Sequence, residues 1–212
     1  MHQKQLRALR YREELAISSH MKIRSLAPIL AVAALSGCGF QSIPQSENAV
    51  SAAWGEVQNQ YQRRADLVPN LVETVKGYAA HERETLTAVV EARAKATSVQ
   101  ITAEELTPEN LQRFEAAQGQ LRSALGRLLA VAENYPQLKA NENFRDLQVQ
   151  LEGTENRIAT ARRRYIESVQ QFNNLVTVPP TSWTNAIMYK KPAKPQFAAT
   201  TPDAEAAPKV KF

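Results

Sequence analysis

The chain has 212 residues, with 26 Lys and Arg, 21 Asp and Glu, and a single Cys, which gives a formal net charge of +5. Residues 1–37 contain six basic and two acidic residues and residues 190–212 contain five and two, whereas residues 38–189 contain 15 and 17. Because the positive charge belongs to the two ends, we expect no nucleic-acid partner, and a single Cys excludes an intramolecular disulfide and a Cys-based zinc site.

Residues 21–37 predict an export signal. They begin with the basic stretch MKIR, continue with an apolar run over 26–35 and end with Ser36 and Gly37. This order is typical of a secretory signal, and the apolar run is too short to span a bilayer core of about 30 Å. Residues 1–20 are polar and charged, so we interpret them as an upstream extension or a mis-called start and predict translation from Met21.

The only cysteine follows this signal directly. The sequence Leu35-Ser36-Gly37-Cys38 is similar to the bacterial lipobox. The resemblance implies cleavage between Gly37 and Cys38, a lipid on Cys38 and a lipidated linker over 38–46; the alternative is a plain signal peptide with an incidental cysteine. We therefore expect a palmitate-type, lipid-anchored membrane protein that faces the periplasm, and Gly39 in place of Asp favours the outer membrane.

The first long helix is predicted over about Glu47 to Thr97. Apolar residues recur there at steps of three and four, the period that keeps one face of a helix towards its partners. Pro69 lies inside this pattern and removes one backbone donor. We therefore expect a kink or break near Leu67 and Val68.

Two further helices are predicted downstream. Thr107 and Pro108 form a good helix start, and the apolar stripe from there reaches Tyr135 before Pro136. The third helix begins near Asn141 or Asn143 and ends at Pro179-Pro180. A short amphipathic piece then covers Ser182 to Tyr189, with Trp183 and Ile187 on one side, and residues 190–212 form a Lys/Pro/Ala-rich tail that we expect to be disordered.

The predicted fold is all-α, because good helix formers dominate and hairpin signals are missing. Three long helices with short connections must bury their apolar stripes against one another as antiparallel neighbours. We expect an elongated coiled-coil-like bundle over residues 47–189, with a break at Pro69 as the alternative that gives four helices.

Three stretches of the chain resemble the LemA family. They cover most of the body in the family's order: RRADLVPNLVETVKGYAAHE (63–82) followed by EARAKA (91–96), LGRLLAVAENYPQLKANENFRDLQ (125–148) and QLEGTENRIATARRRYIESVQQFN (150–173). The resemblance implies a membrane-attached, extracytoplasmic helical bundle, in which a lipid here replaces the usual N-terminal transmembrane helix. The chain departs from the family's usual residues at Ile166, Phe172 and Val178.

Catalytic constellations are missing from the sequence. Downstream of the predicted signal there is one histidine, His81, so neither a Cys-His nor a Ser-His-Asp assembly has its parts. A di-iron bundle would need Glu three residues before that histidine, where Tyr78 stands. We predict that the protein is not an enzyme and holds no metal or cofactor.

Polar residues within the three stretches predict a structural network. We expect Arg93 or Arg162 to pair with Glu133 or Glu155 and so to fix the register of the helices; the alternative is that most of these residues are solvated. Tyr135-Pro136 and Asn141 or Asn143 predict a helix–helix turn. The remaining polar residues expected in the network are Asn70, Glu73 and Asn134.

The function predicted from the sequence is a scaffold or adaptor in the cell envelope, acting on unidentified envelope proteins through exposed helix faces. Whether copies of the chain associate is left open. A membrane-organising or membrane-remodelling protein is the alternative, with Trp183 and the basic tail near lipid head groups. A hydrolase that uses carboxylates in the bundle core is a third interpretation, which needs converging acids in a pocket.

Overall fold

A computed structural model of the protein describes residues 40–197, and these residues form helices and connecting segments without any strand. This confirms the all-α prediction. The helices are an N-terminal helix over 40–76, α2 (Arg83–Ser98), α3 (Pro108–Ala132), α4 (Pro136–Ala140), α5 (Glu142–Thr177), α6 (Thr181–Thr184) and the π-helix η1 (Asn185–Tyr189).

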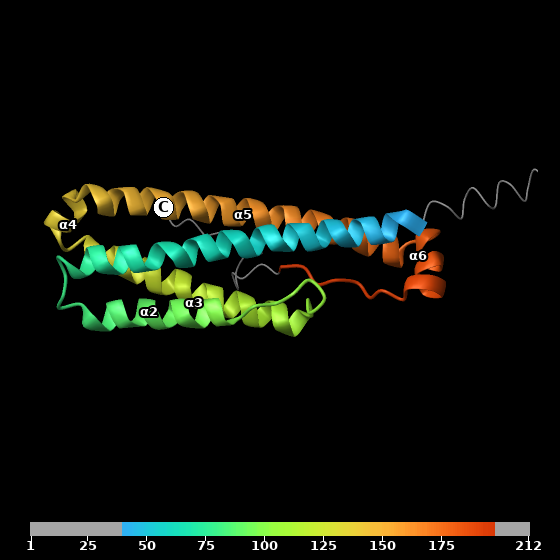
Figure 1. The fold of residues 1–212 in the computed structure, drawn as a ribbon, viewed down its shortest axis with the longest axis horizontal. Helices are drawn as coiled ribbons and strands as arrows, with labels where there is room; N and C mark the ends of the chain where they lie inside the picture. Colours follow the sequence, from blue (N-terminus) through green and yellow to red (C-terminus); the bar gives the residue numbers. More distant parts are fainter. Residues whose placement is uncertain (1–39, 198–212) are drawn as a thin grey trace, which may run out of the picture. The chain divides into compact units, whose positions relative to one another are not determined.

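The described residues divide into two compact units. The larger unit comprises residues 46–174 and 192–197, and the smaller unit comprises residues 40–45 and 175–191. In the larger unit the N-terminal helix, α2, α3 and α5 lie side by side, and each runs opposite to the one before it (Figure 1). The unit is therefore an antiparallel four-helix bundle.

The break in the first predicted helix lies at residues 77–82, and the expected break near Leu67 and Val68 is wrong. The N-terminal helix continues through Pro69 to residue 76 before the chain turns back into α2. Pro69 has no N–H to donate to the carbonyl oxygen of Ala65, its partner in an α-helix. That oxygen instead accepts a hydrogen bond of 2.8 Å from Nε of Arg93 in α2, so the neighbouring helix satisfies the group that Pro69 leaves free.

The apolar spacing of the sequence did not reveal the turn at 77–82, because this turn contains a buried residue of its own. Ala79 is fully buried, and its N–H donates to Val75 O at 2.8 Å. The apolar spacing therefore continues from the N-terminal helix into α2 without an interruption. A pattern of threes and fours marks which residues face the core, and it does not mark where the chain reverses.

The starts of α3 and α5 agree with capping chemistry, whereas the expected helix end at Pro136 is wrong. Oγ1 of Thr107 accepts from the N–H of Asn110 at 3.2 Å, with Pro108 as the first helical residue of α3. Oδ1 of Asn141 accepts from the N–H of Phe144 at 2.9 Å and caps α5. Pro136 was expected to stop a helix, but α3 ends at Ala132 and Pro136 starts α4, since proline fits the first turn.

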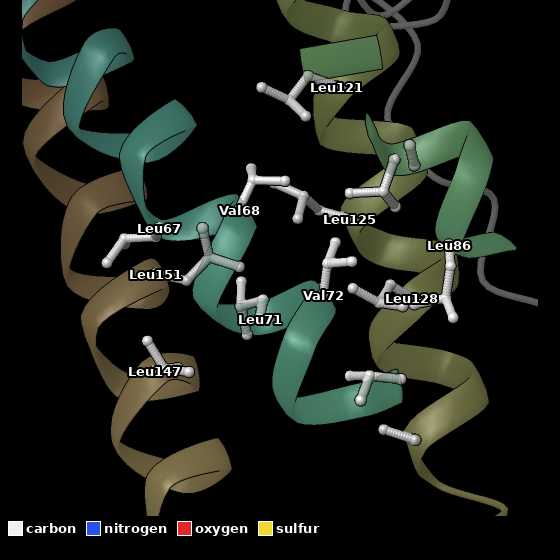
Figure 2. Close-up of a cluster of buried hydrophobic side chains, with 14 of the residues drawn as sticks. Leu67, Val68, Leu71, Val72, Leu86, Leu121, Leu125, Leu128, Leu147 and Leu151 are labelled. Atoms are coloured by element: carbon white, nitrogen blue, oxygen red, sulfur yellow. The ribbon is translucent and has the colours of Figure 1, made fainter. Parts of the chain in front are cut away.

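The core of the bundle is a layered cluster of leucine and valine side chains. Figure 2 shows them directed into the space between the helices, with Leu71 and Val72 from the N-terminal helix, Leu125 from α3 and Leu151 from α5. Each such side chain stabilises the fold by about 1.5–3 kcal/mol when fully buried. These contacts hold the backbone positions from which the polar side chains described below reach one another.

Residues 192–197 pack against the bundle, so the expectation of a disordered tail from residue 190 is wrong for this segment. The carboxamide of Asn173 binds the backbone of Lys194 twice, at 2.9 and 2.8 Å, and the hydroxyl of Tyr165 donates to Pro195 O at 2.9 Å. The ring of Phe197 lies beside those of Tyr165 and Trp54, with centroids 5.2 and 6.2 Å away. A single aromatic residue and backbone hydrogen bonds fix a segment whose composition alone is typical of disorder.

The smaller unit is organised around the buried side chain of Asn185. Its Nδ2 donates to Val176 O and Lys191 O, and its Oδ1 accepts from the N–H of Lys191. The short helical piece predicted over Ser182 to Tyr189 is present as α6 and η1. Ile43 and Val176 are buried aliphatic residues among those described in this unit.

Candidate functional site

The most distinctive polar feature of the larger unit is the buried guanidinium of Arg64, whose side chain is only 2% exposed. Nη1 donates to Oε1 of Glu155 at 3.0 Å, and Nη2 donates to both the backbone oxygen and Oε1 of Gln118 at 3.0 and 2.7 Å. Nε2 of Gln118 in turn donates to Ala96 O at 3.2 Å. These groups come from the N-terminal helix, α5, α3 and α2, so one hydrogen-bonded chain links all four helices.

A second ion pair lies beside the first. Nη2 of Arg162 in α5 donates to Oε1 of Glu115 in α3 at 2.9 Å. The guanidinium of Arg162 also lies 4.2 Å from the ring centroid of Phe197, and that of Arg64 lies 4.9 Å from the ring centroid of Tyr61. Both arginines are thus held by a carboxylate and an aromatic face. We call Arg64, Gln118, Glu155, Arg162, Glu115 and Tyr61 the arginine cluster.

A cavity of about 130 Å³ lies at the arginine cluster. Its charged lining consists of three arginines, Arg64, Arg122 and Arg162, and two glutamates, Glu115 and Glu155. Four of these five groups are already joined in the two ion pairs. Nε of Arg64 is buried and has no hydrogen-bond partner among the described residues, which is a cost that the other bonds of Arg64 offset.

The pKa values of the cluster reflect its burial. Burial raises the pKa of the Glu115 carboxyl above its ordinary value, although the positive charge of Arg162 acts in the opposite direction. Burial also raises the pKa of the Tyr61 hydroxyl, again opposed by Arg162 and Arg64. The glutamates of the cluster face guanidinium groups and not each other, so the arrangement fixes charges in place and does not pair two carboxylates for acid–base chemistry.

The structure separates most of the residues that the sequence grouped into a network. Nε of Arg93 binds a backbone carbonyl and no carboxylate. Arg162 and Glu155 each belong to an interhelical ion pair, but with Glu115 and Arg64 and not with the expected partners. The expected pairing of Arg93 or Arg162 with Glu133 or Glu155 is therefore wrong. The remaining members are exposed: Asn70, Glu73, Glu133 and Asn134.

Three members of the cluster were missed in the sequence: Arg64, Gln118 and Glu115. A signal for Arg64 was present, because the spacing Tyr61–Arg64–Val68 follows steps of three and four as well as Tyr61–Ala65–Val68 does. Arg64 and Ala65 both lie on the buried face. Because Arg63 precedes Arg64, the sequence Arg63-Arg64 resembles an exposed basic stretch, although only Arg63 is exposed.

Two hydrogen bonds join the connections at one end of the bundle. The hydroxyl of Tyr135 donates to Oε1 of Glu82 at 3.1 Å, and Nδ2 of Asn141 donates to the hydroxyl of Tyr78 at 3.0 Å. The 77–82 turn is thereby attached to the connection between α3 and α5. His81 lies in this turn and is exposed, and no group of three or more metal-ligating side chains occurs in the part of the chain that the structure describes.

The predicted lipid attachment at Cys38 and the cleavage position at Gly37 lie outside the described residues. Between residues 40 and 197, no helix combines the length and the apolar character needed to cross a membrane.

Comparison of the sequence with known proteins identifies a family and several relatives. A family model described as the LemA family matches residues 53–212. Protein LemA of Metamycoplasma hominis is 25% identical over 146 residues, which is 69% of this chain and 62% of that protein. The magnetosome proteins MamQ 1 and MamQ 2 of Paramagnetospirillum magneticum are each 34% identical over 67 residues, 32% of this chain and 25% of theirs. The chain therefore spans less than two thirds of the length of each of these relatives.

Proposed function

The chain belongs to the LemA family, and from this premise we propose that it is a lipid-anchored protein of the cell envelope that acts as a non-catalytic scaffold. Exposed faces of its helices would contact other envelope proteins, and the lipid on Cys38 would hold it at the membrane, facing the periplasm. The membrane in question would be the outer one where the cell has two, because Gly39 follows the cysteine.

The observation that carries the scaffold proposal is the bonding of the arginine cluster. Chemistry in a helical bundle would need polar side chains directed into a cavity with their functional groups available. Here Arg64 and Arg162 are bonded across the helices to Glu155 and Glu115. We therefore propose no carboxylate-dependent hydrolase, since both acids that line the cavity are bound to arginine.

The anchor is tested by the chemistry of the N-terminus. We expect the mature chain to begin at Cys38, to carry an acyl mass there in mass spectrometry and to incorporate labelled palmitate. A Cys38→Ala variant should lose the label and keep its signal peptide. An unmodified Cys38, or a label that persists in the variant, would contradict the anchor.

The scaffold is tested by photocrosslinking in living cells. A photoreactive residue replaces Val149 on α5 or Val90 on α2, both exposed apolar residues, and the control position is Leu128, which is fully buried. We expect the exposed positions to trap the same defined envelope proteins in repeated experiments and the buried position to trap none. An equal pattern from all three positions would contradict specific helix-face contacts.

A second candidate function is the organisation of the membrane itself. It is favoured by the exposed apolar side chains of the smaller unit, which include Trp183 and Ile187.

A further inference from the structure

The exposed large apolar side chains of the described residues gather in the smaller unit. Eight such side chains are exposed between residues 40 and 197, and five of them belong to this short unit. Scattered exposed apolar residues are ordinary, whereas a concentration of them marks an interaction surface. We call these five residues the apolar patch: Phe40, Val178, Trp183, Ile187 and Met188.

Polar bonds hold the backbone of the smaller unit while these side chains remain outside. Asn185 fixes the chain between Val176 and Lys191, as described above. The hydroxyl of Tyr189 donates to Phe40 O at 2.8 Å, and the two rings meet with centroids 6.4 Å apart. Phe40 is thereby attached next to η1, so the patch combines the start of the described chain with residues 178–188.

Within this backbone, α6 and η1 present an apolar edge. Trp183 and Ile187 are 65% and 79% exposed, and they are four residues apart in continuous helical turns, so they lie on the same side. The exposed apolar residues of the larger unit are different. Val149 in α5 has Asp146 and Glu152 three residues away on either side, so it is an isolated apolar residue on a charged face.

The charge of the smaller unit has one sign. Its described residues include Lys190 and Lys191 and no acidic residue. Lys190 is exposed and follows η1 in a left-handed conformation with φ of 52°. Apolar and aromatic side chains next to lysines form the combination that binds at the surface of an anionic bilayer, where the rings enter the head-group region and the cations meet phosphate.

We propose that the apolar patch inserts into the surface of an anionic lipid bilayer, with Lys190 and Lys191 at the head groups. The proposal rests on the proposed function, since the acyl group predicted on Cys38 would lie two residues before Phe40. The smaller unit has lysines and no acidic residue among its described residues, which favours a lipid bilayer over a protein as the partner. A bilayer presents many phosphates, and binding to it does not require a surface of complementary shape. The patch would be a second membrane signal beside the anchor.

The experiment uses the intrinsic fluorescence of the two tryptophans. Trp54 is 1% exposed inside the bundle, whereas Trp183 is 65% exposed in the patch. The full protein is purified from its membrane and reconstituted into phosphatidylcholine vesicles with or without phosphatidylglycerol, whose acyl chains are brominated to quench tryptophan at bilayer depth. We expect quenching of Trp183 that is stronger with phosphatidylglycerol, and a Trp183→Phe variant should show none.

Matched variants separate the patch from general surface effects. Ile187→Glu should abolish most of the quenching, whereas Val149→Glu, a substitution at a residue of similar exposure in the larger unit, should leave it unchanged. Replacing Lys190 by Gln should weaken the phosphatidylglycerol-dependent quenching about fivefold, the effect of one cation near an anionic surface. Equal effects of Ile187→Glu and Val149→Glu would overturn the proposal.

The same preparation distinguishes failure of the patch from failure of the anchor. Acylated Cys38 with unquenched Trp183 would overturn the patch and leave the anchor intact. Unmodified Cys38 with quenched Trp183 would overturn the anchor and support the patch. Absent quenching together with crosslinks between two copies at residue 187 would assign the surface to self-association and would also overturn the proposal.

Discussion

The two units of this chain place polar and apolar groups in opposite ways. In the larger unit the guanidinium of Arg64 is buried, and it donates hydrogen bonds to Glu155 and Gln118 on other helices. In the smaller unit the side chains of Trp183 and Ile187 are exposed, and Lys190 and Lys191 follow them in the sequence. A buried charge is stable only when an opposite charge or hydrogen-bonding groups of the same fold surround it. An exposed apolar side chain needs no partner within the fold. The larger unit is therefore specified by its own contacts, and the surface of the smaller unit is suited to contacts outside the chain.

The larger unit also shows how a helical bundle accommodates a proline inside its N-terminal helix. The carbonyl of Ala65, freed by Pro69, is bonded by Arg93 from the neighbouring helix. The side chain of Arg93 does not pair with a carboxylate. It completes the backbone hydrogen bonding of the N-terminal helix. In the larger unit, arginines thus bond to backbone oxygens of other helices as well as to carboxylates.

The largest effect is expected from removing the buried guanidinium. Arg64→Ala should lower the free energy of unfolding by about 3 kcal/mol, because it leaves Gln118 and Glu155 without their donor and opens a cavity. Arg63→Ala, the exposed neighbour, should change it by less than about 0.5 kcal/mol. Urea unfolding of both variants measures the difference, and equal effects would mean that the cluster does not determine stability.

Removing the aromatic residue of the C-terminal segment should have the next largest effect. Phe197→Ala should lower the free energy of unfolding by about 2 kcal/mol, since the ring packs against Trp54, Tyr165 and Arg162. Gln196→Ala, at an exposed position, is the control. Faster amide exchange at Lys194 in the Phe197 variant, and not in the control, would show that the segment has been released. Unchanged exchange would contradict its attachment.

The bond between Arg93 and Ala65 O is tested by a double-mutant cycle. Arg93→Met should cost about 1–2 kcal/mol in the natural background, because the carbonyl loses its donor. In a Pro69→Ala background the new N–H of residue 69 bonds the same oxygen, so the cost of Arg93→Met should be smaller by about 1 kcal/mol. An identical cost in both backgrounds would show that Arg93 does not complete the helix at Pro69.

The smallest effect on stability is expected at the apolar patch. Ile187→Ser should change the free energy of unfolding by less than about 0.5 kcal/mol, because the side chain is 79% exposed. The same substitution at Ile43, which is fully buried in the same unit, should cost about 3 kcal/mol. A large cost at Ile187 in thermal unfolding would indicate that the patch supports the fold instead of facing a membrane.

The helical character of the chain and the starts of α3 and α5 could be predicted from the sequence because the relevant forces are local. Thr107 with Pro108, and Asn141 before α5, cap their helices through side chains only three residues from the N–H groups they bind. The reversal at 77–82 was missed because Ala79 keeps the apolar spacing through the turn. The attachment of residues 192–197 was missed because composition carries no information about where Phe197 packs.

The sequence by itself determined that this chain forms long amphipathic helices, since helix propensity, capping and apolar period all act within a few residues. Only the tertiary structure decided which polar groups meet. Arg64 is 54 residues from Gln118 and 91 from Glu155, and no local rule selects these partners from the many glutamates and glutamines of the bundle. The helices must first pack, and the distances that packing sets then decide which charges are bonded inside and which apolar residues remain exposed.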